Sequence, residues 1–225
     1  MNDLEDTHFW FVGKRLFIQR SLSALPPKRR TILDVGAGTG GTSKFLSHFG
    51  SVTGLEKNQQ AIRFAKKRGL QTKKGSANAL PFRAKTFDLV TFIDVLYHKG
   101  IDEKKALKEA YRVLKPGGTL CITDCALPFL WTHHDVVMEA KYRYTKRRLS
   151  ELVDRAGFTI TQCHYIFTSI FPFFILRHLM RSDKITTPPK LINSLLVKVL
   201  QLEALFPHWI VRLPGSSILI LAHRP

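Results

Sequence analysis

Cysteine is scarce in this chain of 225 residues, and its start lacks the layout of a secretion signal. The three cysteines, Cys121, Cys125 and Cys163, form no CxxC pair and have no histidine at metal-ligand spacing. This argues against a disulfide framework and against a structural zinc site, so no metal is expected. The first ten residues carry three acids instead of a basic and then apolar stretch. We therefore expect a reducing, cytoplasmic compartment.

A long apolar run that could span a membrane is also missing. Charged residues are absent from Ala156 to Leu176, but Phe158–Tyr165 alternates in the manner of a strand and Pro172 interrupts the apolar residues after it. Arg177 ends the run before it offers the roughly 20 continuous apolar helical residues that a bilayer requires. Membrane contact would therefore be made at a surface and not through a span.

Acidic residues are few: 35 Lys+Arg stand against 17 Asp+Glu, which gives a formal net charge of +18. The basic residues outnumber the acidic ones in every quarter of the chain. Such a diffuse basic surface attracts polyanions, whether nucleic acid or anionic lipid headgroups. No aromatic-interleaved RNA-binding signature accompanies the basic run between Lys66 and Lys74, so a solvated helix face explains that run better.

Short apolar runs alternate with helix-like segments along the chain. This alternation predicts an α/β fold with a mostly parallel, Rossmann-like sheet covered by helices on both faces. Strands are expected at Thr31–Val35, Ser51–Glu56, Leu70–Gly75, Phe87–Asp94, Thr119–Asp124, Phe158–Tyr165 and Ser217–Ala222. The helix expected at Glu103–Leu114 should stop at Lys115-Pro-Gly-Gly118, before the next strand begins. Without an internal repeat or a linker, residues 1–225 are expected to form one domain.

Two segments stand outside the alternation. The first is His8–Arg15, followed by a helix to Leu25, and the second is the hydrophobic insert between the last two strands, residues 166–214. Within the insert, Lys190–Phe206 has apolar residues at helical spacing, namely Ile192, Leu195, Leu196, Val199, Leu202 and Phe206, with Ser194, Lys198 and Gln201 opposite. This predicts an amphipathic helix packed through its apolar face on the protein, with contact to a membrane surface as the alternative.

The glycine-rich stretch Ile32–Gly41 begins in a strand and opens a helix expected at Thr42–His48. Such a turn lets the backbone approach a ligand closely, and the helix start offers unpaired N–H groups to an anion. Gly36, Gly38 and Gly41 satisfy GxGxxG, so a dinucleotide site is one interpretation. A Walker A phosphate loop is excluded, because the residue after the last glycine is threonine and not lysine.

Two acids distinguish between the ligands. Asp34, just before the loop, would repel a dinucleotide phosphate but attract a ligand with an ammonium group, such as S-adenosylmethionine. Glu56 ends the second strand, where a carboxylate can accept hydrogen bonds from both ribose hydroxyls.

With these residues the chain resembles the class I S-adenosylmethionine-dependent methyltransferases. The motifs that carry the resemblance lie between residues 31 and 124 in the family's order: Leu33-Asp-Val-Gly-Ala-Gly-Thr-Gly-Gly41, Gly54-Leu-Glu56, Gly75–Phe82, Phe87-Asp-Leu-Val90 and Arg112–Gly118. Three further stretches, His8–Arg15, Phe129–Asp135 and Tyr142–Thr145, are similar to a bacterial-type branch with methyltransferase domains of types 11 and 23. One position departs: Ser76 stands where the family has an acid that binds the adenine amino group, so cofactor affinity is reduced unless Asn78 compensates.

The resemblance implies a seven-stranded sheet with an antiparallel last strand. It divides the chain into an N-terminal helical cap (1–30), a cofactor-binding core (31–165), the insert (166–214) and the last strand (215–225). The residues implied in cofactor binding are Asp34, Gly36, Ala37, Gly38, Gly40, Glu56, Lys57, Ser76, Ala77, Asn78, Asp94 and Val95.

Methyl transfer asks the protein mainly to position the acceptor and to exclude water. A hydroxyl or protonated amine acceptor would also need a base, and His98, His133 and His134 have a suitable intrinsic pKa. Because ligands bind at the carboxyl ends of parallel strands, the insert should emerge beside the acceptor, as a lid or as a contact with an anionic membrane surface.

Three functions remain open at this point. The first is methyl transfer to a small-molecule, glycan or lipid-linked acceptor. The second, motivated by the net charge of +18, is an RNA methyltransferase, although no RNA-binding module is recognisable. The third, motivated by Ser76, is a non-catalytic subunit that binds S-adenosylmethionine. The sequence does not predict the oligomeric state.

Overall fold

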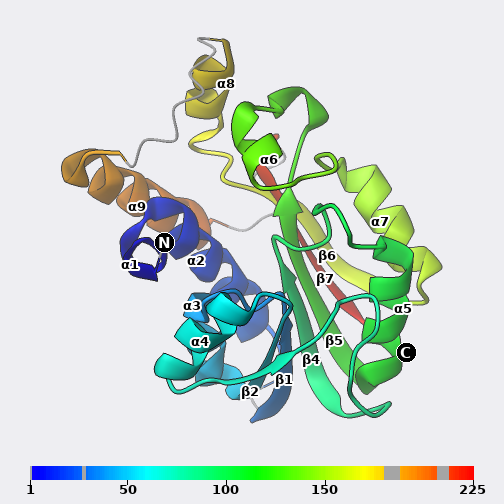
Figure 1. Ribbon diagram of the computed structural model, residues 1–225. Helices are drawn as coiled ribbons and strands as arrows, with labels where there is room; N and C mark the ends of the chain where they lie inside the picture. Colours follow the sequence, from blue (N-terminus) through cyan, green and yellow to red (C-terminus); the bar gives the residue numbers. More distant parts are fainter. Residues whose placement is uncertain (1, 27–28, 180–187, 207–212) are drawn as a thin grey trace.

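A seven-stranded sheet runs through the middle of the computed structural model, which describes residues 2–26, 29–179, 188–206 and 213–225 (Figure 1). The strands are β1 (Arg30–Val35), β2 (Gly50–Glu56), β3 (Gln71–Lys74), β4 (Phe87–Ile93), β5 (Leu114–Cys125), β6 (Thr159–Ile166) and β7 (Ser217–His223). Their order is β3-β2-β1-β4-β5-β7-β6, and β7 runs antiparallel between β5 and β6. The expected sheet with an antiparallel last strand is confirmed.

Helices cover both faces of this sheet and enclose two apolar cores. The helix α2 (Phe9–Ser23) packs over one face together with α9 (Lys190–Leu205), and Leu22 and Leu200 are buried there against Leu89 and Leu219. On the other face, α5 (Glu103–Val113) and α7 (Lys146–Arg155) enclose a second core. The central parallel strands β1 and β4 are buried on both faces, which is why their sequences are mostly apolar runs and not alternating patterns, whereas β3 at the edge is mostly exposed.

The remaining helical segments lie at the ends of strands. They are α1 (Asn2–Thr7), α3 (Gly41–Leu46), the 3-10 turn η1 (Ser47–Phe49), α4 (Gln59–Lys67), the 3-10 turn η2 (Pro128–Leu130), α6 (His133–Val137) and α8 (Phe171–Leu179). Side chains cap several helices: Asn58 accepts from the first turn of α4, Asp102 from α5 and Thr145 from α7. These caps satisfy N–H groups that the helix itself cannot, which fixes where each helix begins.

One expected boundary is wrong. Lys115-Pro-Gly-Gly118 does not separate a helix from a strand; it lies inside β5, which begins at Leu114 directly after α5. Leu114 pairs with Phe87, and the register shifts before Leu89 pairs with Thr119. The irregularity accommodates the proline and the glycines within the strand.

The insert contains α8 and α9, and its residues 180–187 and 207–212 lie outside the described part of the chain. Across the described residues, we find no helix with the length and apolar character needed to cross a bilayer.

The helix α9 packs on the protein as expected, but only part of the expected face makes the contact: Leu196 and Val199 pack there, together with Leu200, which was not expected. Leu195 and Leu202 of the expected packing face are exposed. Two contacts of α9 with α2 explain this orientation. Leu200 packs where Gly13 leaves room, since a Cβ at position 13 would come within 2.7 Å of the leucine. The Asn193 side chain accepts a hydrogen bond from the backbone N–H of Phe9 at 2.8 Å.

Candidate functional site

The glycine-rich turn after β1 leaves room for a ligand at one position. Gly38 and Gly40 both have positive φ, of 54° and 94°. A Cβ at Gly40 would come within 2.4 Å of Leu70, so this glycine is required by packing inside the protein. A Cβ at Gly38 would meet no atom within 4 Å, so the backbone there borders open space. Gly38 is therefore the point at which a ligand can approach the chain.

Glu56, at the end of β2, is held against this turn. Its Oε2 accepts a hydrogen bond from the N–H of Gly38 at 3.0 Å. Its Oε1 accepts from the N–H groups of Lys57 and Asn58, both at 2.8 Å. These three donors orient the half-buried carboxylate beside the open side of the loop. The sequence placed Gly38 and Glu56 in one site, and the structure brings them together, while the Lys57 side chain is exposed.

Asp34 lies deeper than the loop and is 2% exposed. Its two carboxylate oxygens accept hydrogen bonds from Ser43 Oγ at 2.5 Å and from Thr91 Oγ1 at 2.7 Å. Burial raises the pKa of Asp34 to about 6, although both hydroxyls oppose the rise. The carboxylate thus ties β1 to α3 and β4, and its role toward a ligand ammonium group stays a prediction.

Glu5 reaches the same loop from α1, a contact that the sequence did not predict. Its Oε1 accepts from Thr39 Oγ1 at 2.6 Å and its Oε2 from the N–H of Gly41 at 3.1 Å. Arg68 lies 3.8 Å from the same carboxylate. Glu5 therefore satisfies a backbone donor at the start of α3 and ties α1 to the glycine-rich turn.

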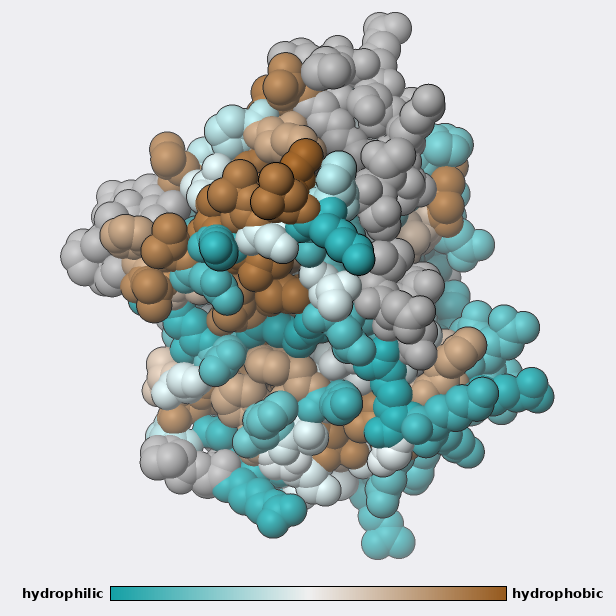
Figure 2. All heavy atoms as spheres, turned by 90° about the vertical axis from the view of Figure 1, so that its left-hand side faces the viewer, coloured by the Kyte–Doolittle hydropathy of each residue, from teal (hydrophilic) through white to brown (hydrophobic). Residues whose placement is uncertain are grey.

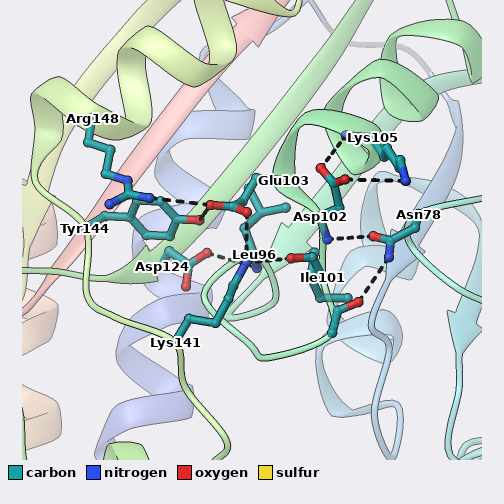
Figure 3. A network of polar contacts seen from close by, with 11 residues as sticks. Asn78, Leu96, Ile101, Asp102, Glu103, Lys105, Asp124, Lys141, Tyr144 and Arg148 are labelled. Atoms are coloured by element: carbon teal, nitrogen blue, oxygen red, sulfur yellow. Dashed lines mark hydrogen bonds and ion pairs between the residues drawn. The ribbon is translucent and has the colours of Figure 1, made fainter.

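The loop after β3 contains Ser76, Ala77 and Asn78, which the resemblance placed near the adenine. Ser76 Oγ accepts from the N–H of Asn78 at 3.2 Å, and Ala77 is buried. The Asn78 amide donates to Gly100 O at 3.0 Å and accepts from the N–H of Asp102 at 2.9 Å (Figure 3). Because the Asn78 amide connects two loops, it is already engaged and offers little to replace the missing acid.

At the carboxyl end of β4, a buried lysine meets two carboxyl groups. Lys14 of α2 is 3% exposed, forms an ion pair with Asp94 and lies 4.8 Å from the Trp10 ring centroid. Asp94 has a φ of 57°, an unusual conformation for a residue other than glycine. Asp124 nearby is fully buried and accepts from the N–H of Leu96 at 3.1 Å. Burial and Asp94 raise the pKa of Asp124 well above its usual value, and the Lys14 charge opposes this.

Beside Asp94, Val95 is buried against the glycine-rich turn, and a polar network supports the loop after it. A Cβ at Gly36 would lie 2.5 Å from Val95, so the two loops touch. Lys141 donates to Ile101 O at 2.5 Å and to Glu103 at 2.8 Å, as Figure 3 shows. The network connects the loop after β4, the start of α5 and the chain beyond α6, which holds this side of the site in place.

The three candidate histidines have different surroundings. His98 Nδ1 lies 2.7 Å from the carbonyl oxygen of Met138, and its ring centroid is 4.2 Å from that of Tyr97. A carbonyl oxygen can only accept, so Nδ1 carries the hydrogen and Nε2 of the neutral ring is the basic nitrogen. His133 and His134 are exposed on α6. The structure thus fixes the orientation of the His98 ring, and the role of a base for any of the three histidines stays a prediction.

Sequence reasoning missed Glu5, Lys14 and Asp124 as members of this site. Glu5 has no local signal, because its partners Thr39 and Gly41 lie 34 and 36 positions along the chain. Lys14 does have one: it interrupts an apolar helix face between Trp10 and Phe17, where a buried charge requires a partner.

The sequence around this site is similar to that of known methyltransferases. Residues 33–122 match the family model described as a methyltransferase domain. A demethylmenaquinone methyltransferase of Renibacterium salmoninarum is 32% identical over 160 residues, which are 69% of this chain and 64% of that protein. A phthiotriol/phenolphthiotriol dimycocerosates methyltransferase of Mycobacterium tuberculosis is 38% identical over 102 residues, 42% of this chain and 37% of that protein. The chain thus spans less than two thirds of these curated relatives.

The fold is also that of solved structures. A SAM-dependent methyltransferase of Thermotoga maritima superposes with a TM-score of 0.63 at 20% identity, over 96% of this chain and 93% of that one.

Proposed function

The chain belongs to the class I S-adenosylmethionine-dependent methyltransferase family, and we propose that it transfers a methyl group from this cofactor to a small-molecule or lipid-like acceptor. The observation that carries the proposal is the Glu56 carboxylate held beside Gly38, where the turn borders open space. When bound, the cofactor supplies an electrophilic methyl group on a sulfonium ion. This chain's own residues must bind it, orient the acceptor and exclude water.

The residues around the turn suit the parts of the cofactor. Glu56 has spare acceptor capacity for a ribose hydroxyl, since its three backbone donors leave one of about four lone-pair sites available, on Oε2. Asp34 supplies negative charge below the loop, which favours an ammonium group. The loop at Ser76 would border the adenine, with a hydroxyl where an acid is usual. These assignments give the glycine-rich turn and its two carboxylates the binding role.

His98 and the N-terminal helix would serve the transfer step. His98 Nε2 would accept the proton from a hydroxyl or ammonium acceptor, because its Nδ1 is committed to Met138. Trp10 and Lys14 cover the carboxyl end of β4, where they would keep water from the reacting atoms.

The names of the relatives bear on the acceptor class. One relative is named for a quinone and the other for phthiotriol dimycocerosates, and both acceptors are apolar. Together with the apolar segments around the site, these names favour a lipid-like acceptor over a glycan. RNA remains the second candidate, because the net charge of +18 favours a polyanion.

A matched pair of glycine variants tests the binding site. Gly38 and Gly69 have positive φ, 54° and 78°, and a Cβ at either would meet nothing within 4 Å. Replacing either with valine therefore imposes a similar backbone strain. We expect Gly38→Val to abolish calorimetric binding of S-adenosylhomocysteine, because its side chain fills the ligand's approach, and Gly69→Val to bind like the wild type. Equal binding by both variants would contradict the site.

The acceptor is tested by activity. Incubation with S-adenosylmethionine labelled in the methyl group and with separate lipid, quinone, glycan and RNA fractions should label the lipid or quinone fraction. Transfer of label to the RNA fraction alone, with a yield that falls as the salt concentration rises, would favour an RNA methyltransferase. Cofactor binding without transfer to any fraction would instead indicate a non-catalytic binding subunit.

A further inference from the structure

Large apolar side chains that reach solvent gather in the last part of the chain. Among the described residues, Phe64 on α4 is the one large apolar residue outside this part that is strongly exposed. The others lie on η2, α6, α8 and α9 and just before β7, and include Phe129, Val137, Phe173 and Leu213. Single exposed apolar residues are common on protein surfaces, but a concentration of them marks an interaction surface.

The helix α9 contributes most to this surface, because it is apolar on two sides. One side packs on α2, with Leu200 fully buried. The other side carries Leu191, Leu195, Leu202 and Leu205, which are 82%, 60%, 59% and 73% exposed. We call these four leucines the outer face of α9. Four strongly exposed leucines on one side of a helix form more apolar surface than a solvated helix face carries, and no described residue buries them.

The surface borders the candidate site. Both β5 and β6 run antiparallel to β7, so they end at the same edge of the sheet. The segments after them in the chain, η2 with α6 and α8, therefore emerge beside Asp94 at the end of β4, and α9 lies near that end in Figure 1. Figure 2 views the side of the molecule on which α9 lies and shows the most strongly hydrophobic atoms gathered in its upper part, above a lower part in which hydrophilic and hydrophobic atoms are mixed.

We propose that the outer face of α9 docks on the surface of an anionic lipid bilayer. The charges on α9 favour this partner. Lys190 and Lys198 are exposed, whereas the acid of this helix, Glu203, accepts from the N–H groups of Thr168 and Ser169 at 2.8 and 2.9 Å. The outward charges of α9 are therefore both positive, within a chain of net charge +18. Basic and apolar side chains on one helix suit an anionic bilayer surface.

A second copy of the chain is a weaker partner for the same face. Self-association would bring Lys190 and Lys198 of two copies together, and each copy carries a net charge of +18. Docking on a bilayer would place the carboxyl edge of the sheet near the lipid, where a lipid-like acceptor could enter without crossing water. The docking itself does not depend on the methyl transfer proposed above.

Vesicle flotation of the full chain tests the proposal. The vesicles are phosphatidylcholine with and without phosphatidylglycerol, at low and high salt. The test variant is Leu191→Ser/Leu195→Ser/Leu202→Ser, and the matched control is Phe64→Ser, whose exposed apolar residue lies outside the surface. All four residues are exposed, so the variants should fold, which circular dichroism checks.

We expect the wild type and Phe64→Ser to float with phosphatidylglycerol vesicles at low salt. The triple variant should bind these vesicles with an affinity at least about tenfold lower. Lys190→Glu/Lys198→Glu should lose the preference for phosphatidylglycerol. Failure of the wild type to float, or equal flotation of the triple variant, would overturn the proposal. A wild-type dimer that the triple variant converts to a monomer, without vesicle binding by either, would assign the face to a second copy.

Discussion

Asp34→Asn would replace a buried carboxylate with a neutral side chain of nearly the same shape. Burial raises the pKa of Asp34 from 3.8 to about 6, so the folded protein binds this proton more tightly than the unfolded chain does. Protonation therefore stabilises the fold below the unfolded pKa, and that stability is lost as the pH rises through about 6. At pH 7 the raised pKa corresponds to a cost of about 3 kcal/mol for the ionised carboxylate.

We expect Asp34→Asn to raise the free energy of unfolding at pH 7 by about 1–3 kcal/mol, because the charge is removed while weaker hydrogen bonds to Ser43 and Thr91 persist. The difference from the wild type should shrink as the pH falls toward 4. Urea denaturation at a series of pH values measures it.

Asp102→Asn provides a control of opposite sign. The pKa of Asp102 is lowered, chiefly by the hydrogen bond from the backbone N–H of Lys105, so its stabilising effect is present at neutral pH and lost in acid. If Asp34→Asn is destabilising at pH 7, or if its effect is the same at every pH, the electrostatic reasoning is refuted. A loss of S-adenosylhomocysteine affinity alongside the gain in stability would show that Asp34 is retained for binding.

Three further outcomes are expected. Gly40→Ala should lower the free energy of unfolding by about 2 kcal/mol or more in urea, because alanine is strained at a φ of 94° and its Cβ would press on Leu70 and on the backbone of Ala65; a fold as stable as the wild type would contradict this backbone conformation. Arg143 donates to both carboxylate oxygens of the buried Asp135 at 2.9 Å, and Arg143→Met should cost about 3 kcal/mol by the same measurement, because Asp135 would keep only its hydrogen bonds from Thr132; an unchanged midpoint would be inconsistent with the pair. Ser76→Asp should tighten calorimetric binding of S-adenosylmethionine through a charged acceptor for the adenine amine, whereas unchanged affinity would mean that other groups compensate.

The sheet was predictable because its central strands are marked locally. Buried parallel strands are short apolar runs, and the stretches from Ile32 to Val35 and from Leu89 to Phe92 show this plainly. The start of β5 was not predictable from the sequence, since its proline and glycines indicate a turn. In the structure, Leu114 pairs with Phe87, and this pairing extends the strand through them. The packing face of α9 was predicted only in part for a related reason. Both sides of α9 carry apolar residues, so periodicity alone could not predict which side packs against α2 at Gly13.

For the site, the sequence predicted the residues near the glycine-rich motif and missed those that arrive from afar. Gly38 and Glu56 share a motif order that resemblance could recognise, and they meet in the structure. Glu5 and Lys14 enter from helices before the first strand, and their contacts depend on how α2 packs across the sheet. Such contacts depend on tertiary structure and have no signal in local spacing.

The packing of α2 on α9 links the order of synthesis to the completion of the site. Phe9 and Asn193, which fix the two helices together, are 184 residues apart. The ring of Trp10 likewise stacks on Phe167 with centroids 4.6 Å apart. A nascent chain therefore completes its glycine-rich turn early, but α2 cannot take its final place with Lys14 until α9 has left the ribosome. The helix α2 is thus translated before every strand of the sheet but takes its final place, with Lys14 on Asp94, only after α9 has been made.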